Sequence, residues 1–428
     1  MRFLYSLFTY VAAPLAFLVQ LGRGVVDPAY RERAGERFGF GRLLEGPTLW
    51  VHAVSVGEVR AAAILVPRLS SRWAGLPVVI TTTTPTGARQ VRELFGDSVT
   101  HAYLPFDTPG SVRRFLDRVR PRAGIIMETE IWPALYGECG RRGIPLTIAS
   151  ARLSPRSTPR YQRLKGLLRT VFAGNVTIAA QSRADAERYQ SIGAPPERTL
   201  VAGNIKFDLD IPTAVLGEGR ALRASMGLER PVWIAGSTRD GEEALLLEAH
   251  ADVRASRPDA LLVLVPRHPQ RFAEVAALLA RRDVPFVTRS SRAPVEPGTA
   301  VLLVDVLGEL LAFYASADVA FVGGTLVPVG GHNLLEPAAL GLPVLAGPHV
   351  FNAPDVARAL LEAGAAIEVR TAGEIAAAVS RLFGDPAERS SRGQAGRAVL
   401  EANRGAVDRV VEIVAGQMGG QVEKRTGG

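Results

Sequence analysis

The sequence predicts an α/β protein with two Rossmann-like domains that face a central cleft, preceded by a hydrophobic helix. The first observation is length, because 428 residues exceed what one hydrophobic core usually organises and suggest two domains of about 200 residues each. The second is that short apolar runs alternate with amphipathic stretches after residue 48, which is typical of parallel strands covered by helices on both faces. The third is an uncharged segment near the N-terminus.

That segment, residues 3–21, reads FLYSLFTYVAAPLAFLVQL and is about as long as a bilayer core requires. Arginines follow it at positions 23, 31, 33 and 37, and an excess of positive charge favours the cytoplasmic side. We therefore predict that residues 1–22 form a membrane anchor that spans the bilayer or lies at its interface. The alternatives are a buried core helix of the first domain and a cleaved signal peptide, although no convincing small-residue cleavage site follows.

The strands of each half are predicted from continuous apolar runs. In the first half they are TLWVHAVSV, LPVVITTTT, HAYLPF, AGIIMETE, PLTIAS, VTIAAQ and TLVAG, and in the second half PVWIAGST, ALLVLVPRH, VPFVTRS, AVLLVD, DVAFVGGT and LPVLAG. The polar link GNIKFDLDIPTAVLGEGR lies between the two sets. We place one domain at residues 23–210 and the other, with a C-terminal helix, at residues 211–428. Paired halves of this kind are typical of the GT-B glycosyltransferase fold.

Polar residues follow three predicted strands of the second half. Ser237 comes after the first of them, Arg267 and His268 after the next, and Gly331 and Asn333 precede a short apolar helix that carries Glu336. Free backbone N–H groups and hydroxyls at such positions suit a phosphate, and a carboxylate one turn into a helix can accept hydrogen bonds from a ribose diol. Ordinary helix caps and surface charges are the alternative for each residue alone, and their repeated position favours a nucleotide site.

The first half offers carboxylates and anion-suited turns. Glu36 lies in a polar loop before the first strand, and Ser55 with Gly57 opens a helix that carries Glu58. A similar turn follows the second strand at Thr84, and Glu128 ends a later strand. No metal-ligand spacing is found among the 6 histidines or the acidic residues, so no metal is predicted, and Arg267 with Lys206 could neutralise a leaving phosphate.

Composition narrows the class of partner. The net charge of +8 suits nucleic acid, an anionic lipid surface or an acidic substrate. Basic and aromatic residues are not interleaved as in proteins that stack bases, so no nucleic acid partner is expected. The single cysteine, Cys139, excludes an internal disulfide and is expected to be a small buried side chain.

Several motifs together resemble the 3-deoxy-D-manno-oct-2-ulosonic acid (Kdo) transferases of lipopolysaccharide core biosynthesis. In order they are GERFGF, HAVSVGE, TTTTPTG, METEIWP, ARLSPRS, PRHPQRF and GGHNLLEPAALGLPVLAGPH, after an apolar N-terminus. The resemblance implies a GT-B enzyme that takes Kdo from CMP-Kdo, attaches it with inversion to a lipid A precursor (lipid IVA), and works at the cytoplasmic side of the cell inner membrane. The net positive charge of the chain suits an anionic membrane surface and an anionic acceptor.

The resemblance also implies roles for individual residues. Glu36, from the G-E-R stretch, is implied as the general base. The implied CMP-binding residues are Ser237, Arg267, His268, Gly331, Asn333, Glu336 and, as a weaker match, Lys206. No cofactor is implied.

Two other interpretations remain open from the sequence. One is another nucleotide-sugar enzyme of GT-B fold, such as a UDP-sugar epimerase or a different glycosyltransferase. The other is a catalytically silent scaffold that binds lipid A at the membrane surface. Binding of CMP against UDP would separate the first from a Kdo transferase.

Overall fold

The computed structural model describes residues 2–426, and it divides the chain into two compact units. The first unit contains the chain up to Asp208 together with the segment from Asn403 onward, and the second runs from Leu209 to Ala402. The predicted boundary at residue 210 is therefore within a few residues of the observed one. The C-terminal helix differs from the prediction, because it packs with the first unit and not with the second.

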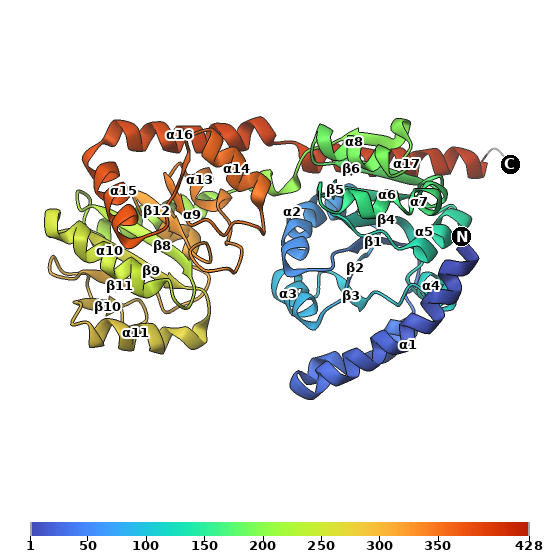
Figure 1. The fold of residues 1–428 in the computed structure, drawn as a ribbon, viewed down its shortest axis with the longest axis horizontal. Helices are drawn as coiled ribbons and strands as arrows, with labels where there is room; N and C mark the ends of the chain where they lie inside the picture. The colour runs from blue at the N-terminus through green and yellow to red at the C-terminus, as the bar shows by residue number, and fades with distance from the viewer. Residues whose placement is uncertain (1, 427–428) are drawn as a thin grey trace. The chain divides into compact units, whose positions relative to one another are not determined.

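The first unit is built on a seven-stranded sheet of order β3-β2-β1-β4-β5-β6-β7 (Figure 1). All of its strand pairs are parallel, as the continuous apolar runs predict. The strands are β1 Thr48–His52, β2 Val78–Thr82, β3 Thr100–Tyr103, β4 Pro121–Met127, β5 Leu146–Ala151, β6 Val176–Ala180 and β7 Thr199–Val201.

Helices cover both faces of this sheet, because neighbouring strand residues point to opposite sides. Leu49 and Val51 face a core with helices α2, α3 and α17, whereas Trp50 faces a core with α4, α5, α7 and α8. The helices are α1 Arg2–Val26, α2 Val56–Arg72, α3 Pro85–Phe95, α4 Pro109–Val119, α5 Pro133–Arg141, α6 Thr158–Gln162, α7 Lys165–Phe172, α8 Arg183–Ser191 and α17 Ala406–Thr426. Short 3-10 turns are η1 Pro28–Tyr30, η2 Ala34–Phe38, η3 Pro196–Arg198 and η4 Ile205–Phe207.

Helix α17 belongs to the first unit for two physical reasons. Val410 and Val414 are fully buried in the core beneath α2. Asp208, at the end of the first segment, accepts hydrogen bonds from the backbone N–H groups of Gly405 (2.6 Å) and Val407 (2.5 Å) at the start of the helix. Removing α17 would expose the part of this core that Val410 and Val414 fill.

The second unit is built on another seven-stranded parallel sheet, of order β10-β11-β9-β8-β12-β13-β14. Its strands are β8 Val232–Thr238, β9 Leu261–Pro266, β10 Phe286–Thr288, β11 Val301–Leu303, β12 Val319–Val322, β13 Val344–Ala346 and β14 Ala366–Glu368. The last of these was not predicted. Its helical elements are α9 Thr213–Met226, α10 Glu243–Ser256, η5 Pro269–Arg271, α11 Phe272–Arg281, α12 Leu310–Tyr314, α13 Leu335–Leu340, α14 Pro354–Glu362, α15 Ala372–Gly384 and α16 Pro386–Asn403.

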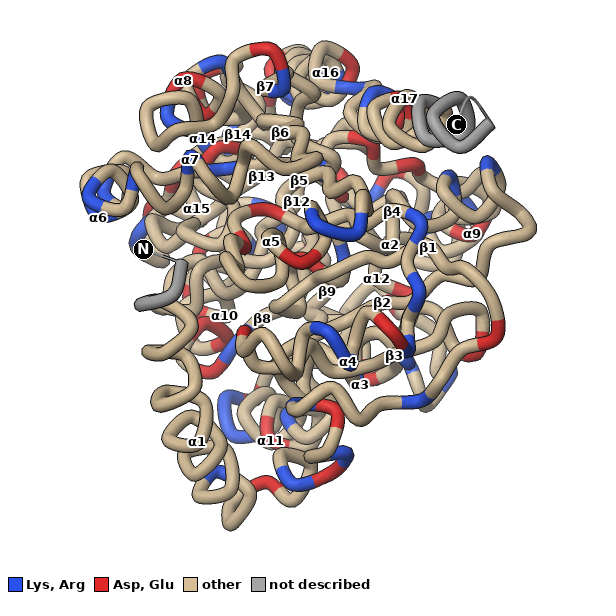
Figure 2. Tube along the Cα trace, turned by 90° about the vertical axis from the view of Figure 1, so that its right-hand side faces the viewer, with Lys and Arg blue, Asp and Glu red and all other residues tan. Residues whose placement is uncertain are grey.

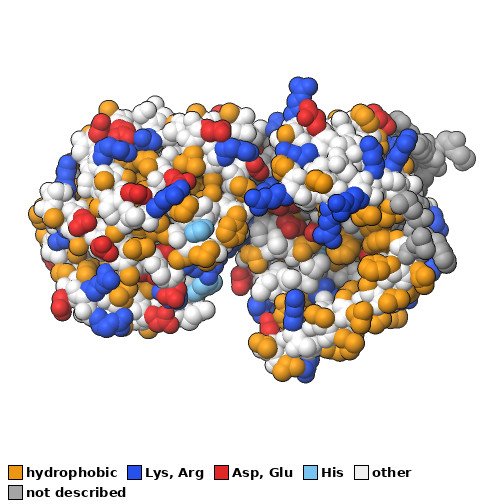
Figure 3. All heavy atoms as spheres, viewed as in Figure 1, with side chains coloured by type: hydrophobic (Ala, Val, Ile, Leu, Met, Phe, Trp, Pro, Cys, Tyr) orange, Lys and Arg blue, Asp and Glu red, His pale blue; other side chains and the backbone are white. Residues whose placement is uncertain are grey.

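Helix α1 packs on the first unit along one side and is otherwise exposed. The Tyr5 hydroxyl donates to Asp107 Oδ2 (2.7 Å), and the Phe17 and Phe38 rings meet edge to face at 5.1 Å. Figure 2 shows few charged positions along the helix, and Figure 3 shows hydrophobic side chains along this edge. Residues Tyr5–Val26 are long and apolar enough to cross a membrane and are mostly unburied, so the alternative of a buried core helix is wrong.

Candidate functional site

The predicted nucleotide-site residues of the second unit meet at one edge of its sheet. Ser237 is the last residue but one of β8, Arg267 and His268 follow β9, and Gly331 and Asn333 follow β12. Because β9, β8 and β12 are parallel neighbours, their carboxyl ends share an edge. The chain continues from β8 to β9 on one side of β8, and it later passes from β11 to β12 on the other side. In open α/β sheets, such a switch point is where ligands bind.

The end of β8 is irregular, because its register with β9 shifts between Gly236 and Thr238. Ser237 is buried and has a φ of 59°, which non-glycine residues rarely adopt. A Cβ atom at Gly236 would lie 2.2 Å from the Tyr314 hydroxyl, and one at Gly323 would lie 2.3 Å from the Ser237 carbonyl oxygen. The two glycines therefore let the β8 and β12 turns approach each other, and strain at Ser237 marks this turn as a functional candidate.

Glu336 lies on the same side as this turn. Asn333 Nδ2 donates to Glu336 Oε1 (3.1 Å), and Asn333 Oδ1 accepts from the backbone N–H of Leu335 (3.1 Å). Burial, and then the nearby Glu336 carboxylate, raise the pKa of Tyr314, whose hydroxyl also adjoins Gly236. Glu336 and the Ser237 turn thus meet around Tyr314.

Arg239 is a functional candidate that the sequence reasoning missed. Its Nε donates to His332 Nε2 (3.2 Å), and its Nη1 bonds His268 Nε2 (2.5 Å). The side chain therefore joins the segment after β8 to those after β9 and β12. Its place two residues beyond Ser237 was the available signal, but spacing alone could not show the histidines beside it.

A buried carboxylate holds the loops of this edge together. The fully buried Glu242 accepts from the backbone N–H groups of Arg239, Gly324, Thr325 and Leu326, at 2.7–3.0 Å. These bonds connect the segment after β8 to the loop after β12.

In the first unit, Glu36 lies in η2 beside the last residue of β3. Its Oε2 accepts from the backbone N–H of Tyr103 (2.7 Å) and from Arg33 Nη2 (2.9 Å). The guanidinium carbons of Arg33 and Arg37 lie 4.7 and 4.0 Å from the centre of the Tyr103 ring. These contacts fix the carboxylate within a short 3-10 helix, where the sequence predicted a loop.

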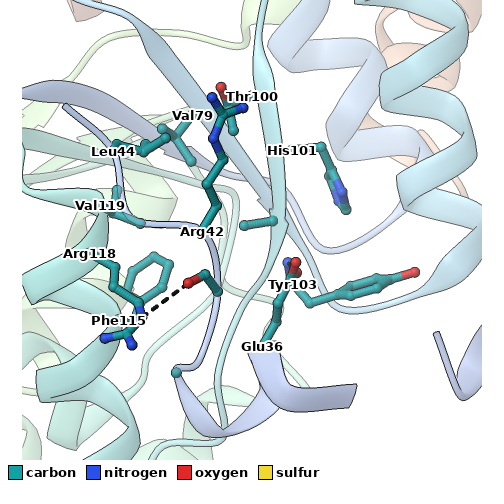
Figure 4. A pocket seen from close by; sticks show the side chains of 13 residues that line it. Glu36, Arg42, Leu44, Val79, Thr100, His101, Tyr103, Phe115, Arg118 and Val119 are labelled. Carbon is teal, nitrogen blue, oxygen red and sulfur yellow. Dashed lines mark hydrogen bonds between the residues drawn. The ribbon is translucent and has the colours of Figure 1, made fainter. Parts of the chain in front are cut away.

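A pocket opens beside Glu36, between β3, helix α4 and the loop after η2 (Figure 4). Leu44, Val79 and Phe115 form apolar walls, and Arg42 and Arg118 are the cations that line it. His101, on β3, also lines the pocket. Burial, followed by the charges of Arg33, Arg92 and Arg37, lowers the pKa of His101 to about 3, so its ring is neutral at physiological pH.

A second group of ionisable side chains lies at the switch point of the first sheet, between β1 and β4. Lys206 Nζ donates to Glu128 Oε1 (2.7 Å), and Glu128 has a φ of 56°. Burial first, with smaller contributions from the neighbouring carboxylates, raises the pKa of both Glu58 and Glu130 to about 7. The structure therefore places Lys206 in the first unit with these acids, whereas the other six predicted CMP-site residues lie in the second unit.

Two turns of the first unit that suggested anion binding act as helix caps. Ser55 Oγ accepts from the backbone N–H of Glu58 (3.3 Å), and Glu58 Oε2 accepts in return from that of Val54 (2.8 Å). Thr84 Oγ1 accepts from the backbone N–H of Gly87 (3.1 Å) at the start of α3. Cys139 is fully buried, as predicted. Within residues that the structure describes, no group of three or more His, Cys, Asp or Glu side chains is placed to hold a metal.

Comparison with solved structures shows the fold. HepE from Anabaena, solved in complex with UDP, is 13% identical and superposes with a TM-score of 0.53, covering 86% of this chain and all of that one. At this identity the likeness shows the fold alone. Together with the two parallel seven-stranded sheets, it defines the class as an α/β protein of GT-B fold.

Sequence comparison identifies the family. A family model described as 3-deoxy-D-manno-octulosonic-acid transferase matches residues 32–209. The 3-deoxy-D-manno-octulosonic acid transferase of Haemophilus influenzae is 42% identical over 96% of this chain and 98% of its own length. That of Bordetella pertussis is 42% identical over 87% of each chain. This chain belongs to the Kdo transferase family and is a glycosyltransferase that transfers Kdo.

Proposed function

We propose that this enzyme transfers Kdo from CMP-Kdo to a lipid A precursor, lipid IVA, with inversion at the anomeric carbon, at the cytoplasmic side of the cell inner membrane. The observation that carries the donor half of the proposal is the convergence of Ser237, His268 and Glu336 at the switch point of the second sheet. A nucleotide with one phosphate suits an edge that offers hydroxyl, imidazole and carboxylate groups together. We assign Arg267, Gly331 and Asn333 to the same site.

For the chemical step we propose Glu36 as general base. The acceptor hydroxyl oxygen attacks the anomeric carbon of Kdo, the bond from that carbon to the phosphate oxygen breaks, and CMP leaves with the bonding electron pair. Glu36 takes the hydroxyl proton. Both of its hydrogen bonds within the described chain end on Oε2, so Oε1 is the oxygen proposed to receive the proton.

The acceptor half of the proposal rests on the surroundings of Glu36. The adjoining pocket combines apolar walls with Arg42 and Arg118, a combination that suits a phosphorylated, acylated sugar. Phe40, on the same loop, is 58% exposed beneath the Arg114 guanidinium, 4.5 Å from the ring centre. The exposed apolar side of α1 supports a membrane location for such an acceptor.

Lys206 lies apart from the other six residues predicted to bind CMP. Its side chain forms an ion pair with Glu128 in the first unit, and we no longer group it with the CMP-contacting residues. It remains a candidate cation for the leaving phosphate.

The test is to incubate the purified enzyme with CMP-Kdo and tetraacyl lipid IVA and to determine the product mass. An added Kdo residue is expected, and NMR of the new linkage should show the anomeric configuration opposite to that of the donor. A parallel incubation with UDP-sugars should give no product. Transfer from a UDP-sugar, or a retained configuration, would contradict the proposal.

A further inference from the structure

Arg239 is a cation whose guanidinium forms no ion pair within the described chain, although the Glu242 carboxylate lies near and bonds its backbone N–H. Its side-chain hydrogen bonds go to His332 Nε2 and His268 Nε2, and imidazole nitrogens that accept hydrogen bonds are uncharged. Within the described chain, the guanidinium forms no ion pair and Nη2 makes no hydrogen bond. Burial lowers its pKa, but an arginine remains charged at physiological pH.

A neighbouring arginine shows the contrasting arrangement. Arg271 forms ion pairs with Asp240 (2.7 Å), Glu243 (3.0 Å) and Glu274 (3.2 Å). Its charge is used inside the protein, to compensate the buried Glu243. Of these two cations, Arg239 is therefore the one that can bind an external anion.

The histidines hold the guanidinium in one orientation. Burial, and then the charges of Arg239, Arg267 and Arg271, lower the pKa of His268, so its ring stays neutral and Nε2 can accept. The backbone of Arg239 is tied to Glu242, and that of His332 donates to the Gly323 carbonyl oxygen (3.2 Å). A guanidinium held from both sides loses little freedom when it binds an anion, and its planar fork suits a phosphate.

We propose that Arg239 binds the phosphate of the nucleotide donor, through the edge of its guanidinium that the histidines do not use. This inference rests on the proposed use of CMP-Kdo and adds the residue that recognises its anion. It lies two residues beyond Ser237, at the carboxyl edge of β8, where the ligand of such a sheet is expected. His268 and His332 are positioning residues for it.

Binding of CMP and of cytidine, measured by calorimetry, tests the assignment. Arg239→Gln should weaken CMP binding by about 10- to 100-fold, the usual effect of losing a charge-assisted hydrogen bond, and leave cytidine binding unchanged. Arg239→Lys keeps the charge but not the fork and should fall between. Arg370→Gln, which removes an exposed arginine of the same unit, is the matched control and should bind both ligands as the wild type does.

The alternatives give different results. Equal weakening of CMP and cytidine binding by Arg239→Gln would show a structural role, and unchanged CMP binding would remove Arg239 from the site; either overturns the inference. Should Arg239→Gln not fold, Arg239→Lys and His332→Asn decide the question by the same ratio of CMP to cytidine affinity. If the wild type binds UMP and not CMP, the proposed donor is wrong, and Arg239 is then tested with UMP against uridine.

Discussion

At the scale of single residues, the two proposed chemical roles depend on carboxylates that are held in different ways. Glu36, in the short 3-10 helix η2, is fixed by Arg33 and the Tyr103 backbone. Glu336 is held by Asn333 within a six-residue helix. Glu58 caps the start of α2, and burial of its carboxyl group raises its pKa. Each can be tested by a change that removes charge and little else.

Replacing Glu36 with Gln should lower turnover by about 10²-fold or more, because general-base help is typically worth about 10²–10⁴-fold. CMP affinity should stay near the wild-type value, since the nucleotide-site residues lie in the other unit. Steady-state kinetics with CMP-Kdo and a detergent-dispersed acceptor provide the measurement. Near-normal turnover would remove Glu36 from the mechanism and direct attention to Glu58 and Glu128.

Replacing Glu336 with Ala should weaken CMP binding, because a ribose diol would lose one or two charge-assisted hydrogen bonds of about 1.5–3 kcal/mol each. Calorimetric titration measures the loss. Glu362→Ala, an exposed acid of the same unit, is the control. An unchanged affinity in a folded Glu336→Ala protein would disprove the ribose assignment.

Glu58→Gln should change how stability depends on pH. Because burial raises the pKa of Glu58 from 4.5 to about 7, the folded state binds more protons than the unfolded state between these pH values. The wild type therefore loses stability as pH rises through this window. The variant avoids that loss and should gain about 1–3 kcal/mol relative to the wild type between pH 5 and pH 8.

Urea unfolding at both pH values measures this gain. Glu93→Gln, an exposed acid of the same unit, should show no comparable change. A Glu58→Gln gain that is equal at pH 5 and pH 8 would mean that Glu58 is ionised throughout.

At the scale of elements, α1 and α17 show that the packing partners of a helix are harder to predict from sequence than its presence. Both were expected as helices, yet their partners are set by contacts distant in sequence. α17 packs into the core of the first unit although the whole second unit, Leu209–Ala402, separates it in sequence from the other elements of that core. α1 keeps one side on the first unit through Tyr5 and Phe17, and leaves residues such as Val11, Leu15 and Leu18 more than half exposed.

We predict that deleting residues 2–21 moves the enzyme from the membrane to the soluble fraction and leaves transfer to a detergent-dispersed acceptor measurable. Leu15→Asp with Leu18→Asp is a milder version, because it changes the exposed side and keeps the contacts of Tyr5 and Phe17. Leu228→Asp, at an equally exposed leucine of the second unit, is the control. Fractionation followed by immunoblotting measures the distribution, and membrane retention of the double variant would contradict an anchoring role.

At the scale of the whole molecule, two parallel sheets each present functional candidates at a switch point or beside an edge strand. The proposed donor site has Arg239, Arg267 and His268, and the first unit has Lys206 with Arg42 and Arg118 near Glu36. Cationic side chains are therefore available to balance phosphate charge without a metal ion.

Activity should accordingly survive exhaustive chelation. The measurement is Kdo transfer after dialysis against EDTA, with and without added Mg²⁺ or Mn²⁺. A requirement for either ion would show that a set of metal ligands was missed. Elemental mass spectrometry of the purified protein would then identify the ion.

The sequence by itself determined what depends on local pattern. Thirteen strands were predicted from apolar runs, because strands buried on both faces have no polar positions, and β14 was missed because its three residues, Ala-Ile-Glu, are too short to show a pattern. Ser237, His268 and Asn333 were expected on one edge because residues that follow parallel strands must share it. The motifs predicted the Kdo transferase family, and the relatives confirm it.

Only the tertiary structure decided which distant groups meet. An apolar stripe on α17 shows that the helix is buried but not in which unit, since either sheet offers an apolar face. In the same way, a lysine in the link between domains can pair with any nearby anion, and folding brought Lys206 to Glu128. Arg239 has its proposed role only because its two histidine partners come from the ends of β9 and β12, and side-chain contacts of this kind depend on three-dimensional packing that no local pattern encodes.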